Sequence, residues 1–273
     1  MKSQSKYQAK KPNAQGVIEY TASEDAVWST LYARQMDIIQ QRACTEFIEG
    51  LAKLNMPPDR VPQLFEISQV LMPLTGWSVV AVPALISTDH FFTLLSQRQF
   101  PAATFIRIPE ELDYLSEPDI FHEFFGHCPM LTQPVYADFM QKYGEIALKA
   151  AEADRELLAR LFWFTVEFGL IKTDAGIRCY GGGILSSKNE TIYALESPVP
   201  QRKVFDAVDV LRTPYRIDIM QNIYYVINSY ADLYELLNTD LSKTIQQARE
   251  LGEFPPSFTT TGYSDQNDEW VTC

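Results

Sequence analysis

The sequence predicts a single domain that is mainly α-helical with small β elements. Apolar residues recur at helical spacing over long stretches, the β-favouring runs are short, and no repeat, low-complexity segment or linker divides the chain. A hydrophobic content of 46% is ordinary for a chain of 273 residues with a real core. We expect a flexible N-terminal tail at residues 1–19, one domain at residues 20–255 and a C-terminal tail at residues 256–273.

The first helix is predicted to begin at the sequence TASE, residues 21–24, which has the pattern of a capping box. Apolar residues follow at roughly helical spacing to about Leu51, and the prolines at residues 57–58 break the pattern. A second helix is expected from near Pro62 to Gly76, because proline suits the first turn of a helix and glycine the position just after its end.

Shorter elements are expected next. Residues 77–82, WSVVAV, form a β-favouring run, and residues 103–108 again suit an extended strand. Between these two runs, Ser87 can cap a short helix that continues through Leu95.

The chain is expected to be mainly helical from Glu117 to Ile171, with further helices near residues 189–195 and 232–241. A glycine cluster lies between β-favouring stretches in GIRCYGGGILSS, residues 176–187, so a hairpin or a bent loop fits there. The three consecutive glycines match neither phosphate-binding pattern, which favours close backbone packing as their purpose.

Charge and cysteine usage limit the partners and the compartment. Acidic residues outnumber basic ones 35 to 23, and the net charge of −12 repels nucleic acid and anionic lipid surfaces. The four cysteines form no CxxC pair, which argues against a disulfide framework and a thiolate zinc site. The N-terminal stretch lacks an apolar signal region, and no run approaches the ~18 apolar residues of a membrane span. We expect a cytoplasmic protein, a monomer or homodimer, without nucleic-acid or membrane partners.

Two of the three histidines, His122 and His127, lie five positions apart in FHEFFGHCP. Five positions of an α-helix separate two side chains by about 140°, whereas the HExxH helix of zinc peptidases needs histidines about 40° apart. A zinc peptidase is therefore disfavoured. For both rings to face one ion, the helix must unwind or end near His127, and Gly126 and Pro129 permit this. The alternative is two ordinary histidines packed among phenylalanines.

A third candidate ligand, Glu167, is the only ionisable residue in LFWFTVEFGLI, residues 161–171. A buried carboxylate is costly unless a cation or a metal meets it. Two neutral imidazoles and one carboxylate form the facial triad of non-haem iron(II) oxygenases, so the set predicts iron and oxygen chemistry. A buried salt bridge from Glu167 to an arginine is the alternative. Cys128 as a thiolate ligand would favour zinc, and a packed, inert cysteine fits better.

Arg107 lies inside the apolar run ATFIRIP, where a buried guanidinium must find an anion. Two partners remain open at this point, a carboxylate of the protein and a carboxylate of a substrate. Asp119, at an expected helix start, is the nearest protein candidate.

The segments PDIFHEFFGHCP, WFTVEFGL and YGGGILSS together resemble the pterin-dependent aromatic amino acid hydroxylases. The resemblance runs from about Tyr20 to about Ser229, and the chain is similar to the single-domain bacterial members that act on phenylalanine. It implies iron(II) bound by His122, His127 and Glu167, and tetrahydrobiopterin or a related tetrahydropterin that supplies two electrons for the reduction of O2. L-phenylalanine would become L-tyrosine, the first step of phenylalanine catabolism.

Other activities remain open beside this one. A tryptophan hydroxylase of the same family is the nearest alternative, because the residues around the substrate ring do not decide between the two amino acids. A metal-dependent hydrolase would act with zinc and without O2. A non-catalytic iron-binding protein would keep the three metal ligands but would need neither a pterin-stacking ring nor a substrate arginine.

The resemblance also implies binding roles. Arg107, held by Asp119, would grip the substrate carboxylate. The substrate ring would be bordered by Trp163, Phe168, Gly182 and Ser186. The pterin would stack on Phe91, with Ala84, Ile86, Thr88, Glu123 and Phe162 nearby. In two departures from common family patterns, Leu115 replaces a hydroxyl side chain near the substrate and Phe162 replaces a tyrosine.

Overall fold

The computed structural model describes residues 7–83, 86–113, 117–238 and 240–258. Within these residues the fold is mainly helical with two small sheets, as predicted. The α-helices are α1 (Ala22–Ile38), α2 (Thr45–Leu54), α3 (Leu64–Thr75), α4 (Thr88–Ser96), α5 (Pro134–Lys149), α6 (Glu152–Phe162), α7 (Gly182–Leu185), α8 (Lys188–Glu196), α9 (Ala207–Arg212), α10 (Tyr230–Asn238) and α11 (Leu241–Leu251). The strands are β1 (Ser78–Val82), β2 (Gln99–Ala103), β3 (Leu170–Thr173), β4 (Gly176–Cys179), β5 (Gln201–Val204) and β6 (Ile223–Ile227).

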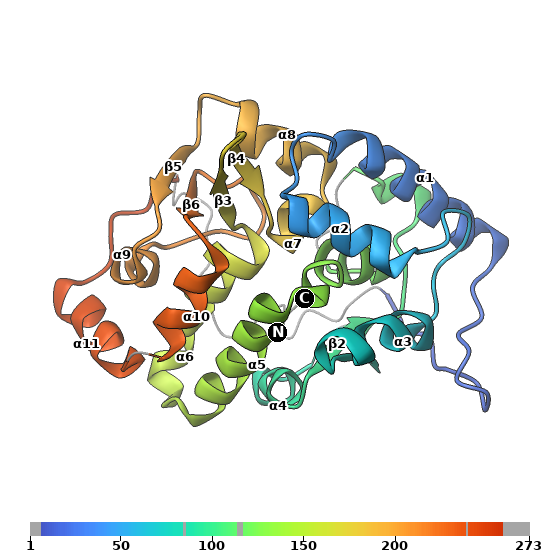
Figure 1. The fold of residues 1–273 in the computed structure, drawn as a ribbon, viewed down its shortest axis with the longest axis horizontal. Helices are drawn as coiled ribbons and strands as arrows, with labels where there is room; N and C mark the ends of the chain where they lie inside the picture. The colour runs from blue at the N-terminus through green and yellow to red at the C-terminus, as the bar shows by residue number, and fades with distance from the viewer. Residues whose placement is uncertain (1–6, 84–85, 114–116, 239, 259–273) are drawn as a thin grey trace.

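The two sheets lie in different parts of the molecule (Figure 1). Strands β1 and β2 pair in parallel, and α3 packs against β1 while α4 packs against β2. The other sheet has the order β4-β3-β6-β5, in which β4 runs antiparallel to β3 and the remaining pairs are parallel. Helix α5 packs against α4 and against α10, and in Figure 1 it occupies the middle of the view. The segment just before α5, which carries both candidate histidine ligands, is largely buried.

Several predicted elements are confirmed at their ends. Thr21 closes a capping box with Glu24 at the start of α1. Gly76 ends α3 with a left-handed φ of 74°, a backbone conformation that costs glycine little. Ser87 caps α4 by accepting a hydrogen bond from the N–H of His90. Strand β1 and helix α8 also lie where the sequence places them.

The prediction of one long helix to Leu51 is wrong, because the chain breaks between α1 and α2. Gln41 has a left-handed φ of 61°, and the next residues bind β4 instead of continuing the helix. The N–H of Cys179 donates to the carbonyl of Arg42, and the N–H of Cys44 donates to the carbonyl of Cys179. No glycine or proline marks this break in the sequence, since the cause is a contact with a distant strand.

The extended segment predicted at residues 103–108 is also misplaced. The strand is β2, and it ends at Ala103. Beyond it, the carbonyl of Phe105 accepts from the N–H of Ile120, and the N–H of Arg107 donates to the side chain of Asp119. The residues after Ala103 therefore bond to the residues just before His122 instead of pairing as a strand.

In the second half, the helical region ends at Glu167 rather than at Ile171, and β3 begins at Leu170. The hairpin is formed by β3 and β4, ahead of the glycine cluster, and the glycines themselves begin α7. Helix α10 ends at Asn238, and Leu241 begins α11 instead of ending α10. Strands β5 and β6, helix α9 and helix α11 are additions to the prediction.

The division into tails at residues 1–19 and 256–273 and a domain at 20–255 stays a prediction. Tyr7 stacks on Phe105 with ring centroids 4.4 Å apart, and Ile18 is buried. Among the described residues, no helix is both long enough and apolar enough to cross a membrane.

Candidate metal centre and active site

His122 and His127 face each other across a single widened turn of helix. Residues His122–His127 form a π-turn, in which the N–H of Cys128 donates to the carbonyl of Glu123, five positions earlier, at 3.3 Å. Residues five apart lie one above the other in such a turn, as residues four apart nearly do in an α-helix. The two Nε2 atoms are 3.0 Å apart. The predicted unwinding of the helix therefore takes the form of a π-turn, a geometry that is frequent at functional sites.

Glu167 reaches the histidines from a second π-turn. Helix α6 runs directly into Trp163–Glu167, and the N–H of Phe168 donates to the carbonyl of Trp163 at 2.8 Å, again across five positions. The Glu167 Oε1 atom lies 3.2 Å from Nε2 of His127, and Oε2 lies 3.7 Å from Nε2 of His122. The structure thus brings together the three side chains that the sequence singled out as metal ligands.

The spacing of these donor atoms fits one metal ion. Bonds of about 2.1 Å at right angles separate neighbouring donors by about 3.0 Å, and the three observed separations are 3.0, 3.2 and 3.7 Å. Burial lowers the pKa of His122 to about 4, so its ring is the neutral form that binds metals. Two imidazoles and one carboxylate on one side of an ion leave positions open for other ligands.

The candidate ligands are held in place by α7 and by Ser186, the residue that follows it. The hydroxyl of Ser186 donates to the carbonyl of Gly182 at 2.8 Å, so it accepts from Nδ1–H of His122 at 2.9 Å. This tautomer leaves the Nε2 lone pair directed at the metal position. A Cβ on Gly182 would lie 2.4 Å from the ring of His127, and one on Gly183 would lie 2.9 Å from Oε2 of Glu167. The glycine cluster therefore provides close packing, as predicted.

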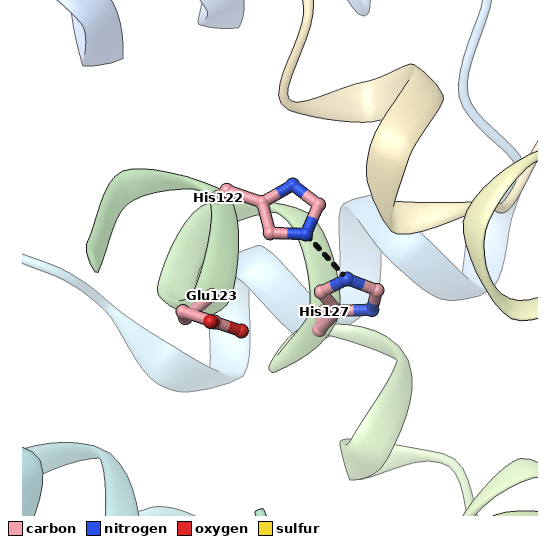
Figure 2. A group of neighbouring side chains, drawn as sticks. All are labelled: His122, Glu123 and His127. Carbon is pink, nitrogen blue, oxygen red and sulfur yellow. Dashed lines mark hydrogen bonds between the residues drawn. The ribbon is translucent and has the colours of Figure 1, made fainter. Parts of the chain in front are cut away.

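A second carboxylate, that of Glu123, is buried beside the same histidines. Donor atoms of His122, Glu123 and His127 lie within 4.8 Å of one another, but Figure 2 shows a hydrogen bond only between the two rings. Within the described part of the chain, neither oxygen of Glu123 has a hydrogen-bond partner of good geometry. Burial, and then the charge of Glu167, raise its pKa well above the ordinary value. The raised pKa favours the protonated form of Glu123, which can donate and accept hydrogen bonds to a ligand.

Arg107 and Asp119 form a buried bidentate pair. The Arg107 Nε and Nη2 atoms lie 2.8 and 2.9 Å from the two carboxylate oxygens, which also accept from the N–H of Arg107 and of His122. Burial opposes ionisation of Asp119, but the charge and hydrogen bonds of Arg107 outweigh it and hold the pKa of Asp119 below its usual value. The protein carboxylate that the sequence left open as a partner for Arg107 is Asp119, which also anchors the start of the histidine turn.

Trp163 and Phe91, which the sequence assigns to the substrate and pterin sites, both contact other aromatic side chains. Trp163 packs between Phe168 and Tyr215, with ring centroids 4.5 and 4.4 Å apart. Phe91 meets Phe162 edge to face at 5.5 Å and is only 1% exposed. Thr88 begins α4 and Ile86 lies just before it, whereas Ala84 and Leu115 lie outside the described residues.

Two residues near Trp163 escaped the sequence analysis. Tyr215 stacks on the indole, and the side chain of Gln221 accepts a hydrogen bond from it at 3.0 Å. Neither residue lies in a motif. Both belong to the loop between α9 and β6, which is distant from Trp163 in sequence and comes close to it only in the folded chain.

The donor set fits the facial triad of a non-haem metalloenzyme. The sequence matches the family described as biopterin-dependent aromatic amino acid hydroxylase over residues 2–259. The chain belongs to this family.

Individual relatives agree with this assignment over most of the chain. A phenylalanine-4-hydroxylase of Pseudomonas aeruginosa is 51% identical over 92% of this chain and 96% of its own length. One of Vibrio cholerae is 52% identical over 92% of this chain and 87% of its own. The structure of phenylalanine hydroxylase from Legionella pneumophila matches with a TM-score of 0.90 and 54% identity, over 92% of this chain and 100% of the other. That of Chromobacterium violaceum with bound Fe(III) matches with a TM-score of 0.85 and 46% identity, over 90% and 89%.

Proposed function

We propose that this chain is a tetrahydropterin- and iron(II)-dependent monooxygenase that converts L-phenylalanine and O2 to L-tyrosine, the first step of phenylalanine catabolism. The observation that carries the proposal is the convergence of two imidazole nitrogens and one carboxylate, 3.0 to 3.7 Å apart, in a chain of the biopterin-dependent family. The relatives at about half identity are phenylalanine-4-hydroxylases, which supports phenylalanine over tryptophan.

His122, His127 and Glu167 hold the iron in this proposal. With the tetrahydropterin as two-electron donor, the bound iron supplies the activation of O2 for aromatic hydroxylation. The protein's part is positional: Ser186 holds His122 in the metal-binding tautomer, and Gly182 and Gly183 let α7 approach the ligands closely. The closed packing around the ligands also keeps bulk water away from the reacting atoms.

Arg107 binds the carboxylate of the amino acid substrate, and Asp119 positions it. The pair supports this role because Asp119 fixes the guanidinium plane and links it to the histidine turn at the N–H of His122. The substrate ring lies near Trp163, Phe168, Gly182 and Ser186. Two half-buried aromatic rings next to Glu167 suit an aromatic side chain.

The pterin lies near Glu123, bordered by Ile86, Thr88, Phe91 and Phe162; Ala84, which the resemblance also assigns to this site, lies outside the described residues. A buried neutral acid without a well-formed protein partner suits the amide and amine edge of a pterin, because it can both donate and accept. Phe91 is covered by Phe162 in the structure, so stacking of a pterin on Phe91 requires a shift of side chains at this place. A cytoplasmic location and a monomeric or homodimeric state complete the proposal.

The test is a tyrosine-formation assay on the purified protein, with iron and tetrahydropterin omitted in turn. We expect tyrosine only when iron, pterin and O2 are all present, and a much lower kcat/KM for tryptophan than for phenylalanine. A preference for tryptophan would change the proposed substrate but not the family assignment. Activity with zinc and without O2 would overturn the proposal in favour of a hydrolase.

A further inference from the structure

Both the nitrogen and the oxygen of the Gln221 side-chain amide form hydrogen bonds with protein groups. It is 4% exposed, and its nitrogen donates to the carbonyls of Arg216 and Ile219 at 2.8 and 3.0 Å. Its oxygen accepts from the indole N–H of Trp163 at 3.0 Å. Carbonyls only accept and an indole N–H only donates, so the amide has one allowed orientation. The oxygen that faces Trp163 is therefore held in place by the rest of the amide.

The backbone of Gln221 is anchored as well. Its N–H donates to Oε1 of Glu190 at 3.1 Å, and the same oxygen accepts from the hydroxyl of Tyr224. Glu190 belongs to α8 and Tyr224 to β6, so Gln221 is tied to two regular elements. A loop residue anchored in this way can position a neighbour as firmly as a residue of a helix or strand.

Trp163 is the neighbour whose position matters. It opens the π-turn that ends at the candidate metal ligand Glu167, and its indole stacks on Tyr215 and packs against the tilted ring of Phe168. These two ring contacts restrain the plane of the indole but leave the ring able to turn and slide within that plane. The hydrogen bond to Gln221 is a directional contact at one point of the ring, so it sets the rotation that stacking leaves open.

We propose that Gln221 is a positioning residue for substrate choice: it holds the indole of Trp163 as a rigid wall of the aromatic-ring site and thereby favours phenylalanine over the larger tryptophan. The inference rests on the proposed function, in which Trp163 borders the substrate ring. A rigid wall also keeps the ring in register with the metal, so the hydrogen bond contributes to the coupling of pterin oxidation to tyrosine formation.

The experiment compares Gln221→Met with Gln63→Met in the full-length, iron-loaded enzyme. Both changes replace an amide by an apolar side chain of similar length, and Gln63 bonds the backbone of Ile18 rather than Trp163. In Gln221→Met we expect the phenylalanine KM to rise about threefold to tenfold, the range for one neutral hydrogen bond. We also expect the ratio of kcat/KM for phenylalanine over tryptophan to fall by a similar factor, with less tyrosine formed per pterin oxidised. Gln63→Met should lose thermal stability without either change.

A double-mutant cycle with Trp163→Phe isolates the contact. The phenylalanine side chain introduced at position 163 has no indole N–H. Adding Gln221→Met to Trp163→Phe should therefore cause no further change in the substrate ratio. An equal fall of the ratio in both backgrounds would overturn the proposal, because the effect would then bypass the hydrogen bond. A wild-type ratio and KM in a folded Gln221→Met protein would overturn it as well.

A measurement on the unmutated enzyme covers the case in which Gln221→Met fails to fold. The indole N–H of Trp163, assigned by its loss from the ¹H–¹⁵N spectrum of Trp163→Phe, should exchange slowly with solvent. Rapid exchange would contradict a fixed contact. Failure of the proposed function would look different, since the wild-type enzyme itself would then form no tyrosine.

Discussion

Glu167 and Glu123 are both buried beside the same two histidines, yet their side chains meet different surroundings. Glu167 faces the Nε2 atoms of His127 and His122 at 3.2 and 3.7 Å, where a cation can hold it ionised. Glu123 has no such partner, and burial together with the charge of Glu167 raises its pKa well above the ordinary value. Residue type and burial are the same, so the difference comes from the direction in which each side chain points.

Asp119 is a third buried carboxylic acid, and its charge is compensated in a different way. Its carboxylate accepts two hydrogen bonds from the guanidinium of Arg107 and two from backbone N–H groups, which hold its pKa low. We therefore expect three ways of stabilising a buried carboxyl group in this protein: a bound metal for Glu167, an arginine for Asp119 and a retained proton for Glu123. These three assignments predict substitution effects of very different size.

The largest effect is expected for Glu167→Gln. The amide keeps the shape of the side chain but removes the charge, so iron binding should weaken and activity should fall by about 100-fold or more. Iron content of the purified protein and the rate of tyrosine formation measure both effects. Normal iron content with normal turnover would show that Glu167 is not a ligand, and His122→Ala and His127→Ala should resemble Glu167→Gln.

A smaller effect is expected for Arg107→Lys, which keeps the charge but loses the planar fork. We expect the phenylalanine KM to rise about tenfold to 100-fold, as the loss of a charge-assisted hydrogen bond implies. Iron content and the pterin KM should change little. If steady-state kinetics gave a wild-type phenylalanine KM, Arg107 would serve only its internal pair with Asp119.

Phe91→Ala tests the proposed pterin site, to which Glu123 is also assigned. Loss of a stacking ring should raise the pterin KM by about fivefold, equivalent to about 1 kcal/mol. The phenylalanine KM serves as the internal control and should stay near wild type. An effect on the phenylalanine KM alone would remove Phe91 from the pterin site.

The smallest effect is expected for Glu123→Gln, the same chemical change as in the first variant. A neutral acid and an amide both donate and accept, so iron content should be unchanged and the pterin KM should rise by only about twofold to threefold. Iron analysis beside Glu167→Gln makes the matched comparison. Loss of iron from Glu123→Gln would reverse the roles of the two glutamates.

The three candidate metal ligands could be singled out from the sequence because each is anomalous in its own segment. Glu167 is an isolated carboxylate in an apolar run, and the spacing of His122 and His127 already required a disturbed helix. The form of the disturbance was not predictable, since a π-turn and a helix end both satisfy the spacing. The choice is made by packing, in which Gly126 approaches Gly182 so closely that a Cβ would lie 2.7 Å from its carbonyl oxygen.

What the sequence missed depends on contacts between distant segments. The break at Gln41 follows from pairing of residues 42–44 with β4, and no local signal marks it. Gln221 is an ordinary polar residue until the fold places it against Trp163. Its role became visible only when the donors and acceptors around its amide could be counted.

Neither π-turn has the spacing of a regular α-helix. A peptide of residues 118–129 alone would be too short to hold a stable helix in water, and α-helical spacing would set its two histidines about 140° apart. Tight binding of iron therefore requires the complete fold, and each ion bound adds to the stability of the folded state. Chelation should lower Tm, and iron starvation would leave a larger unfolded fraction open to proteolysis. We therefore expect iron supply to affect the lifetime of this enzyme as well as its rate.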